Sequence, residues 1–129
     1  MRLSAKLGLA FAGIAALAGG WTLTAHARNN SETLKGYVTD TWCGVNRDTK
    51  APSVECTNFC VKSKAAKYAF YNLADKKVYI LNPQEMAGKY AGQLVNVTGS
   101  VGTESQKFKT MRGDGEGLTI TASTIAKAN

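Results

Sequence analysis

The sequence is poor in histidine, cysteine and proline, and the scarcity of histidine restricts its chemistry most. The only histidine is His26, which lies in an N-terminal segment with the pattern of an export signal. If that segment is removed, residues 28–129 contain no imidazole, and a Ser-His-Asp triad is excluded. No pair of carboxylates has a spacing typical of glycoside hydrolysis either. We therefore predict a protein that is not an enzyme.

The first 27 residues predict export from a bacterial cell. Arg2 and Lys6 form a basic start, the residues that follow are apolar or small, and Ala25 and Ala27 supply the A-x-A cleavage pattern. We expect a signal peptide over 1–27, and one domain over the remaining residues in the periplasm or the medium. An uncleaved anchor is the alternative, since about 17 to 25 apolar residues can span a bilayer. After cleavage no membrane span is expected.

Basic residues are in moderate excess without being concentrated in one run. Loss of Arg2 and Lys6 leaves 14 of the 16 basic residues against nine acidic ones, which we interpret as a solvated surface. Aromatic residues interleaved with lysines are typical of an OB-fold surface that binds nucleic acid, and equally of the core of a small barrel. These residues are Tyr68, Phe70, Tyr71, Tyr79 and Phe108. Export argues against nucleic acid, so the expected partner is a small ligand or a protein of the cell envelope.

Short alternating segments predict a mainly β domain. The alternation is clearest over 93–101, where Val95, Val97 and Gly99 share one face. Further strands are predicted over 34–40, 68–73, 78–81, 107–111 and 118–125. The three alternating glycines of 113–117 predict a loop instead.

Two short helices interrupt the strands. Ser53 is the predicted cap of the first helix, on which Cys56, Phe59 and Cys60 share a face that we expect to point inward. The second helix is predicted to have Asn82 as its cap, with proline at its first position. This order of strands and helices predicts a small OB-like β-barrel of five to six strands, with a β-sandwich or roll as the alternative.

The three cysteines permit one internal disulfide and leave one thiol over. A disulfide between Cys56 and Cys60 would be strained inside a regular helix, so we expect Cys43 to pair with one of them. Such a bond would close a loop of about 13 to 17 residues and contribute roughly 3 kcal/mol. In this interpretation the protein is a binding or structural domain without a cofactor.

A metal or redox site is the alternative interpretation of the same cysteines. Three sulfurs suit Cu(I) or Zn(II), with Met111, Asp40, Asp48 or water as a fourth ligand. A thiol-exchange role requires one thiol made acidic by a helix N-terminus or by lysines. Thioredoxin chemistry is not supported, because a C-x-x-C motif is missing.

Five segments of the chain form a pattern of motifs: Gly36-Tyr37-Val38-Thr39-Asp40-x-x-Cys43-Gly44, Cys56-x-x-x-Cys60, Ala66-Lys67-Tyr68, Val78-Tyr79-x-Leu81 and Ala91-Gly92-x-x-Val95-x-Val97-Thr98-Gly99. In these segments the chain resembles a family of small exported bacterial proteins of unassigned function. The resemblance implies an exported OB-like domain and carries over only the three cysteines as site residues. A histidine often follows the C-G pair in that family, whereas residues 45–48 here are Val, Asn, Arg and Asp. This departure weakens a metal or haem role for this chain.

Overall fold

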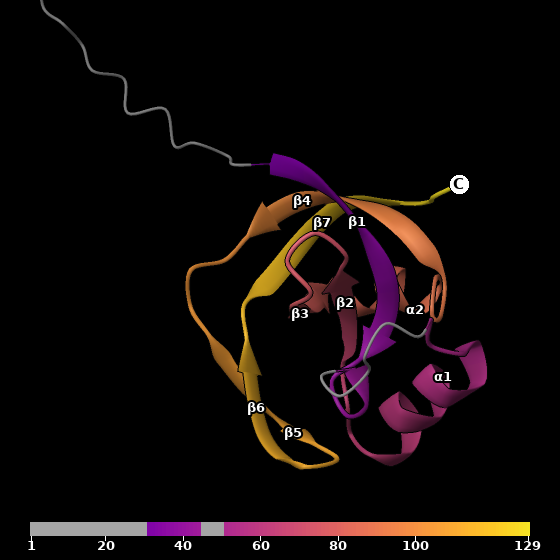
Figure 1. Cartoon of the computed structure of the whole chain (residues 1–129), viewed down its shortest axis with the longest axis vertical. Helices are drawn as coiled ribbons and strands as arrows, with labels where there is room; N and C mark the ends of the chain where they lie inside the picture. Colours follow the sequence, from indigo (N-terminus) through magenta and orange to yellow (C-terminus); the bar gives the residue numbers. More distant parts are fainter. Residues whose placement is uncertain (1–30, 45–50) are drawn as a thin grey trace, which may run out of the picture.

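The computed structural model describes residues 31–44 and 51–129 and is mainly β. Five strands form a closed ring in the order β1-β2-β3-β7-β4. Figure 1 shows this ring with α1 and the β5–β6 hairpin below it. The bounds are β1 Ser31–Asp40, β2 Tyr68–Asn72, β3 Val78–Asn82, β4 Leu94–Val101 and β7 Thr119–Lys127.

The strand pairing is that of an OB-fold. All neighbours in the ring are antiparallel except β3 and β7, and β4 closes the ring by pairing with β1. Along the chain, helix α2 (Gln84–Gly88) lies between β3 and β4. The OB-fold has its helix at the same point, between its third and fourth strands in chain order. The predicted mainly β, OB-like fold with two short helices is therefore confirmed.

The core lies inside the ring and follows the alternation in the sequence. Val95 and Val97 on β4 are fully buried with Val38, Phe70 and Leu81 from the first three strands. Because side chains of a strand alternate between its faces, every second residue of β4 enters the core, as the sequence predicts. The partly buried residues between them lie on the outer face.

Helix α1 (Val54–Ser63) begins at the predicted cap. The Ser53 hydroxyl accepts a hydrogen bond from the Cys56 backbone N–H at 3.0 Å, and Ser53 is in an extended conformation. The expectation that Phe59 points inward is wrong, because its side chain is 59% exposed while Cys60 is 3% exposed. Thr57 is fully buried in its place, so the inward face of the helix is rotated toward Thr57 and Cys60.

Loss of this cap should measurably weaken the domain. We expect Ser53→Ala to lower the free energy of unfolding by about 1 kcal/mol, because the Cys56 N–H loses its acceptor. Urea unfolding followed by circular dichroism measures this change. Ser53→Asp is the control, since a carboxylate can also accept this hydrogen bond. An equal loss in both variants would contradict a capping role.

The cap of helix α2 differs from the prediction. Asn82 is the last residue of β3, where it pairs with Thr121 of β7, and Pro83 occupies the cap position without a side-chain hydrogen bond. Gln84 joins the helix to the strands instead. Its amide nitrogen donates to the carbonyls of Leu81 and Tyr68, and its amide oxygen accepts from the Tyr68 N–H at 2.8 Å. The parallel pairing of β3 with β7 thus takes Asn82 away from the predicted cap.

The glycine-rich segment is a strand, which corrects the predicted loop. β6 (Gly113–Gly117) pairs with β5 (Gln106–Thr110), and Phe108 lies opposite Gly115. A Cβ at Gly115 would lie 2.7 Å from the Phe108 ring, so the ring covers the glycine directly. An aromatic ring over a cross-strand glycine compensates for its missing side chain. β6 is therefore stabilised by its pairing with β5, and the composition of 113–117 alone does not predict this pairing.

Several predicted features lie outside the described residues. These are the signal peptide over 1–27 with its cleavage residues Ala25 and Ala27, and the candidate ligand Asp48. Across the described ranges, none of the helices has the length and apolar character needed to cross a membrane.

Candidate thiol centre

The three cysteines come together at one end of β1. Cys43 lies in the turn after β1, whereas Cys56 and Cys60 are one helical turn apart on α1. The three sulfur atoms all lie within 4.8 Å of one another. Cys43 and Cys60 are in direct contact, with 3.6 Å between their Sγ atoms. Two chain segments therefore meet through all three thiols.

Asp40 fixes the position of Cys43. Its side chain is fully buried at the end of β1, and one carboxylate oxygen accepts hydrogen bonds from two backbone N–H groups, of Trp42 at 2.9 Å and of Cys43 at 2.8 Å. A carboxylate that accepts from the backbone two and three residues ahead holds the chain in a tight turn. The turn is also attached to the start of β2, because the Thr41 N–H donates to the Lys67 carbonyl at 2.9 Å.

A glycine allows α1 to approach the barrel closely. Gly92 has a φ of +75°, and a Cβ there would lie 2.7 Å from the backbone nitrogen of Val54, the first residue of α1. The Gly92 N–H donates to the Val38 carbonyl at 2.8 Å, which connects this contact to β1. The helix carrying Cys56 and Cys60 is thus seated next to the strand that leads to Cys43.

The most buried thiol is held in its neutral form. Burial raises the pKa of Cys60 to about 12, and the hydrogen bond with Cys43 and the negative charge of Asp40 act in the same direction. A thiol of this kind is a poor nucleophile, because the thiolate is the reactive species. The arrangement therefore does not favour the thiol-exchange interpretation at Cys60. Bound metal is a different case, since a metal ion deprotonates the thiols that coordinate it.

The sulfur separations suit metal coordination. Ligands at a Zn–S distance of about 2.3 Å in tetrahedral geometry lie about 3.8 Å from one another. The contact between Cys43 and Cys60 is close to that value, and the 4.8 Å limit on the other pairs requires shifts of about 1 Å at most. Cys43 and Cys56 are half-buried, so the centre is accessible from the surface.

The structure places Met111 near the centre through its backbone. Its N–H donates to the Trp42 carbonyl at 3.0 Å, which attaches the tip of the β5–β6 hairpin to the residue before Cys43. The Met111 side chain is 56% exposed. The Lys64 ammonium, at the end of α1, lies 5.6 Å from the centroid of the Trp42 ring. Trp42 thus contacts both the hairpin, through its carbonyl, and the end of α1, through its ring.

Sequence reasoning considered Asp40 only as a ligand and did not identify its positioning role. The sequence signal for such a role is an aspartate at the start of a turn, because its carboxylate can accept hydrogen bonds from the backbone N–H groups two and three residues ahead. The contact of Gly92 with α1 joins residues that are far apart in the sequence, so it is seen only in the folded structure.

No protein-family model, no curated protein and no solved structure matches this chain. The thiol centre is therefore interpreted from its own geometry.

Proposed function

We propose that this protein is an exported OB-like domain that binds a soft metal ion, Cu(I) or Zn(II), through Cys43, Cys56 and Cys60. The observation that carries the proposal is the convergence of all three sulfur atoms within 4.8 Å from two separate segments. A disulfide that only staples the loop needs two cysteines, and it gives no reason for the third to lie beside them. Soft thiolate ligands favour these two metals.

The residues around the thiols support metal binding without catalysis. Asp40 and Ser53 orient the backbone of Cys43 and of Cys56, so the ligands are arranged before the ion arrives. Such a preformed centre loses little conformational entropy on binding. The expected role is the storage, transfer or structural use of the ion in the periplasm or the medium, not turnover of a substrate.

Metal stoichiometry tests this proposal. Protein purified from metal-replete cells should carry about one Cu or Zn per chain by elemental analysis and native mass spectrometry, and Cys56→Ser should reduce this to below about one tenth. Ser63→Ala, on the exposed end of the same helix, is the matched control and should retain the ion. Circular dichroism checks that the variants are folded. Metal-free wild-type protein, or equal loss of metal in the control, would overturn the proposal.

A disulfide-stapled binding domain is the second candidate, and the contact between Cys43 and Cys60 favours it. Their sulfurs are 3.6 Å apart, and a disulfide bond requires about 2.05 Å. Alkylation under denaturing conditions without reductant, followed by intact mass measurement, separates the two candidates. One adduct on Cys56 would support the staple, whereas three adducts would support thiols protected by a metal.

A further inference from the structure

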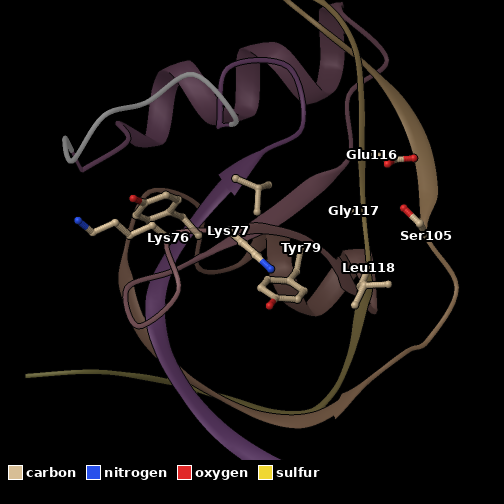
Figure 2. A pocket seen from close by; sticks show the side chains of 9 residues that line it. Lys76, Lys77, Tyr79, Ser105, Glu116, Gly117 and Leu118 are labelled. Atoms are coloured by element: carbon tan, nitrogen blue, oxygen red, sulfur yellow. The ribbon is translucent and has the colours of Figure 1, made fainter.

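The three thiols are reached directly from the protein surface and not through a cavity. Figure 2 shows a cavity of about 400 Å³ between the β2–β3 turn and the hairpin strand β6, with Lys77 and Glu116 among its lining residues. None of the cysteines lines this cavity. Cys43 and Cys56 are half-buried at the surface, whereas Cys60 is 3% exposed. An ion or a small oxidant therefore meets Cys43 or Cys56 first, and Cys60 is the inner thiol.

The contact between Cys43 and Cys60 is compatible with two chemical states. Their Sγ atoms are 3.6 Å apart, close to the separation of about 3.8 Å for two sulfur ligands of one tetrahedral ion. A disulfide requires about 2.05 Å, so the two atoms need to approach each other by about 1.5 Å. Rotation of the Cys43 side chain between rotamers changes this distance without moving α1. The same two thiols can therefore bind an ion or join covalently, but not both at once.

Cys56 is placed to remain a thiol when the other two join. It is one helical turn from Cys60 on α1, where a disulfide between them would be strained. Its backbone N–H donates to the Ser53 hydroxyl at 3.0 Å, which fixes that turn of the helix. Protein sites for zinc use at least three protein ligands, so Cys56 alone does not retain the ion.

We propose that the thiol centre is a redox switch, in which a disulfide between Cys43 and Cys60 releases the metal ion and reduction of that bond restores the site. The inference rests on the proposed metal-binding function. It assigns Cys43 as the thiol that meets the oxidant, Cys60 as the thiol that completes the disulfide, and Cys56 as a ligand only. The protein then holds its ion under reducing conditions and gives it up under oxidising ones.

The electrons for this switch come from sulfur, and a disulfide such as oxidised glutathione accepts them. Thiols that coordinate a metal ion are deprotonated. The Cys43 thiolate attacks one sulfur of oxidised glutathione, so that a mixed disulfide forms and the first glutathione thiolate leaves. The Cys60 thiolate then attacks the Cys43 sulfur and displaces the second glutathione thiolate. Two electrons pass from the cysteines to glutathione, the two glutathione thiolates and Cys56 each take up a proton, and the ion leaves with its charge unchanged.

Metal binding and oxidation oppose each other by the same free energy. Because the ion binds only the reduced centre, it makes the disulfide harder to form by the factor with which the disulfide weakens its binding. Each tenfold rise in free ion above its Kd therefore lowers the ratio of disulfide to dithiol tenfold. For a two-electron couple this factor raises the midpoint potential by about 30 mV.

Redox titration of the wild type in glutathione buffers tests the switch, with free Zn(II) set by a metal buffer. Zn(II) is the probe because it does not change its own oxidation state. Alkylation with intact mass measurement gives the disulfide fraction, peptide mapping identifies the pair, and native mass spectrometry gives the bound zinc. We expect one ion lost for each Cys43–Cys60 disulfide and its return after dithiothreitol and Zn(II). The midpoint should rise by about 30 mV for each tenfold increase in saturating Zn(II).

Two variants separate the switch from the metal proposal. Cys56→Ser should lose the ion and still form the disulfide at equilibrium, with a midpoint that Zn(II) does not shift, whereas Ser63→Ala should behave as the wild type does. Three results in a wild type that binds Zn(II) would overturn the switch alone: an oxidised form that keeps the ion, a disulfide that includes Cys56, or an unmoved midpoint. A wild type that takes up neither Zn(II) nor Cu(I) would overturn both proposals.

Discussion

Replacement of Gly36 by alanine is expected to destabilise the domain strongly. A Cβ at this position would lie 1.9 Å from the Tyr71 carbonyl oxygen and 2.7 Å from the tip of the Phe70 ring. β1 cannot move away, because Gly36 faces Asn72 of β2 on one side and Val95 of β4 on the other. Overpacking of this kind costs about 3 kcal/mol or more, a large part of a typical stability of about 5–15 kcal/mol. Guanidinium unfolding followed by tryptophan fluorescence measures the loss.

Gly102→Ala is the matched control for this experiment. The closest atom to a Cβ at Gly102 is the Thr119 carbonyl oxygen at 3.4 Å, which is ordinary contact. Because the position is also exposed, we expect a change within about 0.5 kcal/mol. An equal loss of stability in Gly36→Ala and Gly102→Ala would show that steric conflict between β1 and β2 does not cause the destabilisation.

The ring of strands could be predicted because its signals are local. Val95, Val97 and Gly99 alternate on β4, and the turn between β2 and β3 separates two runs of strand-forming residues. β6 could not be predicted in this way, because its glycines carry no strand preference of their own. Its order depends on the Phe108 ring over Gly115, a contact made between two strands.

The thiol centre could be predicted only in part. Helical spacing places Cys56 and Cys60 together, but the addition of Cys43 depends on how the turn after β1 and the start of α1 are held. The Asp40 carboxylate holds the turn by accepting from the Cys43 N–H, and Gly92 lets α1 approach the barrel at Val54. Both contacts form only when the chain folds. The outward position of Phe59 has the same origin, since the seating of α1 on the barrel decides which face is buried.

Asp40→Ala is expected to weaken metal binding at least tenfold. The substitution removes the acceptor of the Trp42 and Cys43 N–H groups, so the turn that presents the Cys43 sulfur to Cys60 loses its main constraint. Loss of a residue that orients a ligand typically costs about 10–100-fold in metal affinity. Competition with a chromophoric chelator measures the affinity, and circular dichroism establishes that the variant is folded.

Asp40→Asn separates this positioning role from the charge of the carboxylate. The amide oxygen of asparagine can accept the same two N–H groups, and both variants lose the same negative charge. We therefore expect Asp40→Asn to retain metal affinity within a few-fold of the wild type. Equal weakening in the two variants would assign the effect to charge, and unchanged affinity in both would show that Cys43 reaches the centre without Asp40. The difference between alanine and asparagine thus reports how far the turn after β1 preforms the centre, independently of which metal occupies it.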